Sequence, residues 1–154
     1  MKNENYSSRF TANITSNEAC KGISKVTEWL SKNIEGKTER LNDIFTYYSK
    51  DTWVTFKITE VVDNKKIVWH VMNCYLASFK DKTEWKNTEV VFEISENGNS
   101  IQINFTHIGL VPEIECYNAC VKGWNDYVTG SLLSFLTSGN GQPAEIKFWV
   151  NIDK

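Results

Sequence analysis

The 154-residue sequence has few of the groups that bind metals, phosphates or cofactors. His70 and His107 are its only histidines, and its four cysteines form no CxxC pair. Cys116 and Cys120 are spaced one helical turn apart, but no histidine pair supports them, so we expect no metal site. The sequence also has no glycine-rich phosphate loop, and no cofactor is predicted.

Charge and hydropathy argue against two further partners. Lys and Arg are not clustered and the formal net charge is −2, so nucleic acid is not expected. No apolar run approaches the roughly 18 residues needed to cross a bilayer, so no membrane span is expected. The N-terminal stretch MKNENYSSRF lacks the apolar core of a signal peptide. We therefore predict a cytoplasmic protein with free thiols.

Aromatic side chains are what the sequence has in excess. Six Trp, six Tyr and eight Phe make up 13% of the chain. The length fits a single domain over residues 1–154 and suffices for a core of its own. An aromatic surplus of this size either packs that core or lines a pocket, and the sequence leaves both possibilities open.

Hydrophobic periodicity predicts a strand, two short helices, a series of strands and one long helix, in that order. The strands are expected at 6–14, 41–48, 52–62, 66–77, 88–96 and 100–108. One short helix begins near residue 17 after a Ser16 cap, and the other covers about 23–31. The long helix follows Pro112 and stops at Gly139, a residue suited to a helix C-terminus. Residues 79–87 form a charged loop that holds Trp85.

Two tight turns set the predicted register of the strands, and the register decides which side chains share a face. The turns are expected at Asn97-Gly98 and Asn64-Lys65. Both hairpins then contribute to one aromatic-rich face, which includes Trp69, Asn73, Tyr75, Phe92, Phe105 and His107. Trp53 and Met72 fall on the opposite face, where large apolar side chains are less expected.

The long helix carries one apolar stripe when its residues are placed about 100° apart. The stripe consists of Tyr117, Cys120, Val121, Trp124, Tyr127, Val128, Ser131 and Phe135. It must cover the apolar face of the sheet, because no other element is large enough. A twisted sheet curls, so the space beneath a straight helix is either filled or left as a cavity, and the small Ser131 favours space. A flank of small residues permits a close backbone, in a monomer or a weak homodimer: Ala119, Gly123 and Gly130.

Three segments carry a resemblance to a known family: KITEVVDNKKIVWHV, WKNTEVVFEIS and FTHIGLVPEIECYNACVKGWNDYVTGSLLSFLTSGNG. They resemble the START and Bet v 1-like superfamily (SRPBCC), and within it the bacterial proteins grouped with the C-terminal domain of the heat-shock protein 90 ATPase activator. The helix signature lies at Glu115, Cys116, Trp124, Tyr127 and Ser131-Leu132. The resemblance implies an α+β helix-grip fold, in which a curved antiparallel sheet of six to seven strands wraps around a long C-terminal helix and two short helices follow the first strand.

The resemblance also implies a function. The superfamily binds hydrophobic small molecules between sheet and helix, so non-catalytic binding of a small hydrophobic or aromatic, lipid-like or polyketide-like molecule is the first hypothesis. A co-chaperone-like or other protein-interaction role is the alternative, although the eukaryotic activator binds the chaperone through an additional N-terminal domain that this sequence does not contain. Some members are polyketide cyclases or aromatases, so an enzyme that uses His107 and a tyrosine is the third hypothesis.

The candidate ligand-binding residues come from the two facing surfaces and one loop: Trp69, Asn73, Tyr75, Trp85, Phe92, Phe105, His107, Tyr117, Cys120, Trp124, Tyr127 and Ser131. Trp69 and Trp124 could sandwich a planar ligand, and Trp85 could cap the pocket mouth as a gate. His107 could be a general base or ligand partner, or a histidine bonded to a backbone carbonyl. Cys120 could be a nucleophile beside it, or an inert buried thiol.

Overall fold

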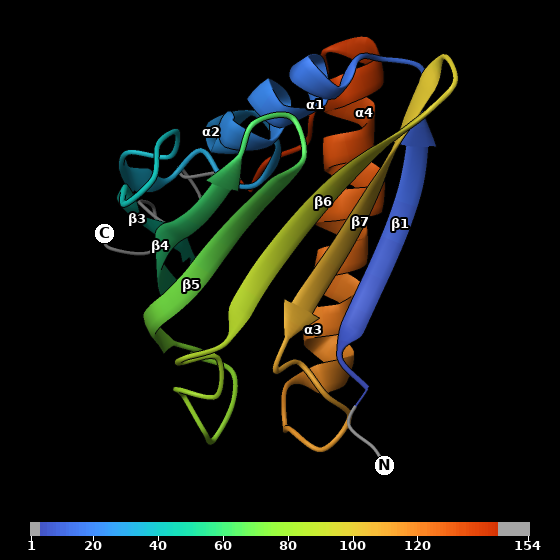
Figure 1. Ribbon diagram of the computed structural model, residues 1–154. Coiled ribbons are helices and arrows are strands. Elements are labelled where there is room, and N and C mark those ends of the chain that lie inside the picture. The colour runs from blue at the N-terminus through green and yellow to red at the C-terminus, as the bar shows by residue number, and fades with distance from the viewer. Residues whose placement is uncertain (1–3, 145–154) are drawn as a thin grey trace.

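The structure, a computed structural model, describes residues 4–144 and consists of an antiparallel sheet crossed on one face by a long helix (Figure 1). Residues 1–3 and 145–154, the ends of the predicted domain, lie outside the described residues. Within 4–144 the sheet has seven strands in the order β1-β7-β6-β5-β4-β3-β2. The predicted α+β helix-grip fold is confirmed.

The strands are β1 (Tyr6–Ala12), β2 (Ile34–Gly36), β3 (Ile44–Ser49), β4 (Thr52–Val62), β5 (Lys66–Tyr75), β6 (Glu89–Asn97) and β7 (Ser100–Ile108). Two short helices, α1 (Ser16–Ser24) and α2 (Val26–Trp29), follow β1 as predicted. The segments α3 (Tyr117–Trp124), η1 (Asn125–Leu132) and α4 (Leu133–Ser138) form one continuous rod, called here the C-terminal helix. The edge strand β2 was not predicted, because three residues carry too little alternation to be recognised.

Thr15, rather than Ser16, caps helix α1. Its hydroxyl accepts the backbone N–H of Glu18, and the Glu18 carboxylate accepts the backbone N–H of Thr15. This reciprocal arrangement is a capping box, which satisfies two donors that the helix itself cannot. The predicted cap was therefore one residue too late, because the Glu three positions after Thr15 completes the pair.

The C-terminal helix begins at Tyr117 rather than just after Pro112, because residues 111–116 form successive turns. Its central segment, η1, is wider than an α-helix. Segment η1 has π-helical geometry, with i→i+5 bonding that is rare in proteins. A π turn holds more residues than an α turn, so a uniform spacing of about 100° misplaces side chains beyond Trp124. Gly139 ends the helix with a φ of 84°, which glycine tolerates, as predicted.

The β6–β7 hairpin has the predicted facing but a different register. Asn97 pairs with Ser100, so Gly98 occupies the first central position of the turn, with a φ of 66°. A glycine at that position suits a tight hairpin turn. The shift is two residues, which preserves the face of every side chain. Phe92 lies opposite Phe105, and both are fully buried.

The β4–β5 hairpin departs from its predicted facing towards the end of β5. A register shift between Thr55 and Phe56 inserts an extra residue on the β5 side. Such a bulge reverses the alternation beyond it. Cys74 is therefore buried, whereas Asn73 and Tyr75 are exposed on the outer face. The prediction that Asn73 and Tyr75 face inward is wrong.

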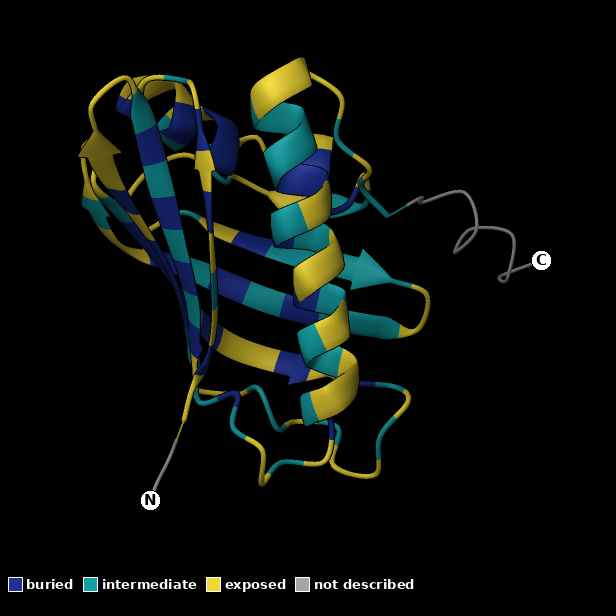
Figure 2. Cartoon of the chain, turned by 90° about the vertical axis from the view of Figure 1, so that its right-hand side faces the viewer, coloured by how far each residue is buried: buried dark blue, intermediate teal, exposed yellow. Residues whose placement is uncertain are grey.

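The core lies between the helix and the sheet face that it crosses, where buried positions alternate along the strands (Figure 2). One half of it is solid aromatic packing around Trp69, whose side chain is 1% exposed. The ring centroid of Trp69 lies between 4.9 and 6.3 Å from those of Trp29, Phe45, Phe56 and Phe92. These rings pack closely together in this half of the interior.

Candidate ligand-binding site

A cavity of about 170 Å³ lies between the C-terminal helix and strands β3 and β4. The residues after β5 and the end of α2 complete its walls. The lining residues are Leu30, Tyr47, Thr52, Val54, Phe56, Leu76, Phe79, Trp85, Ala119, Cys120, Gly123, Trp124 and Tyr127. None of these described lining residues carries a charge at neutral pH. Because burying an unpaired charge is costly, the site favours a neutral molecule.

A larger groove of about 530 Å³ lies elsewhere, between α1 and the β4–β5 hairpin. It is bordered by Lys21, Lys25, Glu39 and Asp63, which bring charges of both signs to its rim. It lies outside the space between helix and sheet. The smaller cavity, with its mainly apolar walls, is the candidate site because ligand pockets are typically apolar and concave.

Two stacked indoles form one wall of the cavity. The ring centroids of Trp85 and Trp124 are 5.7 Å apart, and the planes differ by 9°. The indole N–H of Trp85 donates to Cys116 Sγ (3.3 Å), and that of Trp124 donates to His107 Nδ1 (3.0 Å). Both indole donors are thus already used. Trp69, predicted to form a sandwich with Trp124, lies in the solid aromatic half of the core instead.

Two glutamates fasten the loop that carries Trp85 to the start of the C-terminal helix. The Glu84 carboxylate accepts two backbone N–H groups just before α3, at 2.8 and 3.1 Å. The Glu115 carboxylate accepts the backbone N–H groups of Lys80 (3.0 Å) and Asp81 (3.1 Å). These two bonds lower the pKa of Glu115. Trp85 thus lies at the cavity wall on a loop tied to the helix, and its role as a gate stays a prediction.

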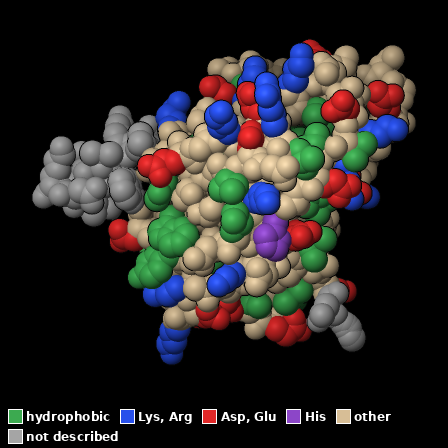
Figure 3. All heavy atoms as spheres, turned by 60° about the vertical axis from the view of Figure 1, so that its left-hand side comes forward, with side chains coloured by type: hydrophobic (Ala, Val, Ile, Leu, Met, Phe, Trp, Pro, Cys, Tyr) green, Lys and Arg blue, Asp and Glu red, His purple; other side chains and the backbone are tan. Residues whose placement is uncertain are grey.

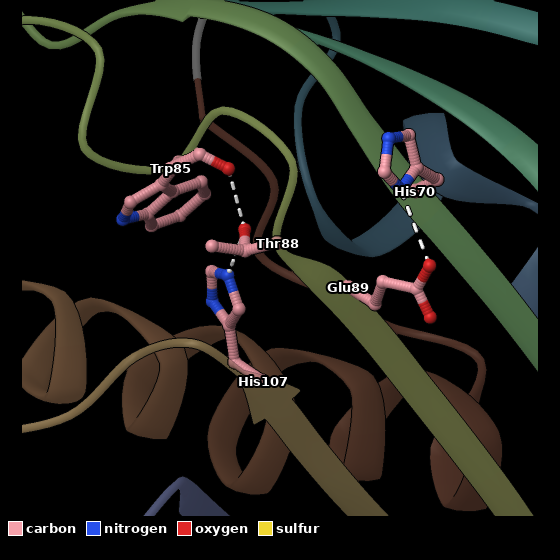
Figure 4. Close-up of polar contacts among 5 residues, drawn as sticks. All are labelled: His70, Trp85, Thr88, Glu89 and His107. Carbon is pink, nitrogen blue, oxygen red and sulfur yellow. Dashed lines mark hydrogen bonds and ion pairs between the residues drawn. The ribbon is translucent and has the colours of Figure 1, made fainter.

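His107 joins this loop to the helix from inside the protein, and Figure 4 shows its contact with Thr88 on the loop side. Its side chain is 0% exposed. Nδ1 accepts the Trp124 N–H, Nε2 lies 2.8 Å from Thr88 Oγ1, and that hydroxyl donates to the carbonyl oxygen of Trp85 (2.6 Å). Because an indole only donates, Nδ1 is unprotonated and the neutral ring carries its proton on Nε2. Burial lowers the pKa of His107 to about 3, so the imidazole is neutral at pH 7.

A general base needs a lone pair directed at its substrate. The lone pair of His107 is directed at the Trp124 indole, and its Nε2 proton at Thr88. The geometry is that of a satisfied core histidine, with side chains rather than a backbone carbonyl as its partners. His70, the other histidine, pairs with Glu89 across β5 and β6 (3.2 Å) and does not line the cavity (Figure 4).

The two helix thiols differ in their access to the cavity. Cys120 lines it, whereas Cys116 is fully buried. The neighbouring Cys116 thiol, and then burial, raise the pKa of Cys120, so that side chain is protonated at neutral pH. A protonated thiol is a poor nucleophile, which favours the inert reading of Cys120. Among residues 4–144 no three potential metal ligands come together.

The predicted site residues fall into separate places. Trp85, Cys120, Trp124 and Tyr127 line the cavity. The others do not: Trp69, Phe92 and Phe105 pack the core, His107 lies behind the indoles, Asn73 and Tyr75 are on the outer face, and Tyr117 and Ser131 lie elsewhere on the helix.

Ser131 fills its surroundings rather than leaving space. Its hydroxyl donates to the carbonyl oxygen of Trp29 (2.8 Å) and accepts the backbone N–H of Gln142 (2.6 Å), and its side chain is buried. The expectation of open space beside Ser131 is therefore wrong. The space lies nearer the start of the helix, where Ala119, Cys120, Gly123 and Trp124 line the cavity.

Several lining residues were not among the predicted site residues: Leu30, Tyr47, Thr52, Val54, Phe56, Leu76, Phe79, Ala119 and Gly123. Strand alternation could have found Tyr47 and Phe56, which occupy inward positions of β3 and β4. Leu76 and Phe79 follow the irregular end of β5, where the alternation is out of phase.

Comparison with solved structures places this architecture among known proteins. The solution structure of the Aha1 dimer from Colwellia psychrerythraea matches with a TM-score of 0.73 at 18% identity, over 90% of this chain and 99% of that one. CalU16 from Micromonospora echinospora matches with a TM-score of 0.62 at 12% identity, over 90% and 87%. DynU16, from the dynemicin biosynthetic locus, matches with a TM-score of 0.67 at 10% identity, and the chain spans 48% of its length.

The chain therefore has the fold of these solved structures, the helix-grip arrangement that the sequence predicted. Within that fold class, the chain resembles the Aha1-like bacterial proteins in structure, as the sequence predicted. No protein-family model and no curated protein matches the sequence itself. Among the described residues, no helix is long and apolar enough to cross a bilayer.

Proposed function

We propose that this protein binds one small, neutral, apolar or aromatic molecule between the C-terminal helix and the sheet, without catalysing a reaction. The observation that carries the proposal is a cavity with uncharged, mainly apolar walls beside the aromatic cluster around Trp69. Apolar cavities of about 150 Å³ stay dry and bind benzene-sized molecules. A volume of about 170 Å³ therefore suits one or two fused rings. Larger lipid-like or polyketide-like ligands would require the cavity to widen.

The direct test is a titration with a small aromatic hydrocarbon such as toluene. Because Trp85 and Trp124 form one wall, we expect saturable quenching or enhancement of tryptophan fluorescence and a matching rise in the melting temperature. The absence of saturable binding across a panel from benzene to naphthalene would contradict the proposal.

Gly123→Leu should close the cavity without harming the fold. The new side chain would extend into open space, since a Cβ there meets no atom within 4 Å. Leucine is also a better helix former than glycine, by about 0.8–1 kcal/mol, so stability should rise. Binding of toluene should weaken by about tenfold or more, because the ligand would overpack the filled site. The matched control is Gly123→Ala, which gives a similar gain in stability but leaves most of the space. Equal toluene affinity in the two variants would place the ligand elsewhere.

A second candidate function, protein interaction, rests on the outer face of the sheet. Trp53 lies opposite Tyr48 on β3 and Tyr75 on β5. Met72, three residues before Tyr75 on β5, has a side chain that is 39% exposed. Hydrophobic side chains gather between charged ones on this side of the molecule (Figure 3). The related Colwellia protein was solved as a dimer, so a second copy of this chain is the first partner to test. Sedimentation should then show a dimer for the native protein and a monomer for Trp53→Ala. A monomer in both cases would exclude a second copy of the chain as the partner. A chaperone partner would be sought by pull-down with the same pair.

A further inference from the structure

Two tyrosine hydroxyls meet at the edge of the cavity. Tyr47 comes from strand β3 and Tyr127 from segment η1, and their oxygens are 3.4 Å apart. Their ring centroids are 6.5 Å apart with planes at 83°, so the rings meet edge to face and the hydroxyls converge. Both residues line the cavity. The pair therefore places polar atoms at one defined point of an otherwise mainly apolar wall.

The pair has one more donor than it uses. Each phenol carries one proton and can accept as well as donate. Ser49 also hydrogen-bonds to the Tyr47 hydroxyl and lowers its pKa, which is the effect of a donor on a phenol oxygen. Only one proton can lie between the two phenol oxygens, so with Ser49 as a donor the other phenol O–H can donate to a third group. Burial, and then the neighbouring Tyr127, raise the pKa of Tyr47, so its proton is retained at neutral pH. Tyr47 is thus a donor rather than a base.

The two indole donors along the described cavity wall are already engaged. The indole N–H of Trp85 donates to Cys116 and that of Trp124 to His107. Thr52 Oγ1 accepts the backbone N–H of Ala77 (3.0 Å), so its own O–H is a single competing donor, and a thiol such as that of Cys120 is only a weak donor. A buried polar group of a ligand loses free energy unless it finds a partner. The phenol pair is the place in this wall where two hydroxyls converge, and the double variant below leaves Thr52 in place as the alternative donor.

We propose that the Tyr47–Tyr127 pair selects, for this cavity, neutral aromatic molecules that carry a single hydrogen-bond acceptor, such as aromatic ketones. This inference rests on the proposed function and narrows its ligand class. The indole wall recognises the ring, and the phenol pair recognises the acceptor. Carboxylates are disfavoured because the described lining holds no cation to pair with them.

The experiment compares two ligands of nearly the same shape, acetophenone and α-methylstyrene, which differ by a carbonyl oxygen in place of a CH₂ group. Dissociation constants are measured by calorimetry at pH 7. One net hydrogen bond contributes about 0.5–1.5 kcal/mol, so the native protein should prefer acetophenone by roughly 2- to 12-fold. In the double variant Tyr47→Phe/Tyr127→Phe the ratio should fall to 1 or below, because the ketone oxygen is then buried without a partner, with α-methylstyrene binding unchanged within roughly twofold. Each single variant retains one hydroxyl and should keep part of the preference.

Tyr117→Phe is the matched control, because it removes a hydroxyl from a helix tyrosine outside the cavity lining and should leave the ratio unchanged. Binding of α-methylstyrene reports that each variant is folded. Equal affinities for the two ligands in the native protein would overturn this inference and leave the proposed function standing. A preference that survives in the double variant would also overturn it. If neither ligand binds the native protein, the proposed function fails and this inference fails with it.

Discussion

Replacing Trp69 by alanine is expected to lower the free energy of unfolding by about 3–5 kcal/mol. The indole is 1% exposed and contacts four aromatic rings, from α2, β3, β4 and β6. Its removal forfeits the burial of the largest apolar side chain type and leaves a cavity that a rigid aromatic cluster fills poorly. Because small domains are stable by about 5–15 kcal/mol, this single change would consume much of the total.

Urea unfolding followed by circular dichroism gives the measurement, and Trp53→Ala is the matched control. Trp53 is the same residue type on the outer face and is only partly buried, so its loss should cost about 1 kcal/mol or less. A loss at Trp53 as large as that at Trp69 would mean that the aromatic half of the interior is not the main source of stability.

Acidification from pH 6.5 to about 3 is expected to remove about 4–5 kcal/mol of stability through His107 alone. The folded state holds this imidazole neutral, with a pKa of about 3 against an ordinary value of 6.5. Between these two values the unfolded chain binds a proton that the folded protein does not. The contribution of His107 to the free energy of unfolding is therefore fully present above pH 6.5 and is lost as the pH falls towards 3.

His107→Gln separates this effect from the titration of carboxylates. A glutamine can accept from Trp124 through its oxygen and donate to Thr88 through its nitrogen, but it does not titrate. The variant should be less stable than the native protein at pH 7, because the amide fits the imidazole site imperfectly. The two stability curves should converge as the pH falls from 6.5 towards 3. Parallel curves would show that His107 is not the group responsible.

Much of the fold could be predicted because the face on which a strand side chain lies depends only on whether its position is odd or even. The exact pairing of the strands matters less. The β6–β7 turn was misplaced, yet Phe92, Phe105 and His107 still face inward, since a shift of two residues leaves every side chain on its own face. The pairing of the C-terminal helix with the sheet followed from apolar area alone, and Trp124 does lie against Phe105, with ring centroids 4.6 Å apart.

The site was harder to predict because it depends on local irregularities. The bulge opposite Thr55 places Asn73 and Tyr75 on the outer face, and no residue in β5 indicates a bulge, since bulges need no particular side chain. No residue pattern indicates the π-helical segment either. Ser131 was read as open space because it is small, whereas its two hydrogen bonds tie three segments together. A volume argument fails wherever a small polar residue serves as a bonding point.

The reciprocal bonds of Glu84 and Glu115 decide how firmly the indole wall is held. They fasten the Trp85 loop to the start of the rod that also carries Trp124, so both indoles belong to one assembly. Any movement of Trp85 away from the rod would have to break these four bonds, so the wall keeps its place beside a guest. The bonds that Glu115 accepts lower its pKa, so its half of this fastening persists as the solution becomes more acidic.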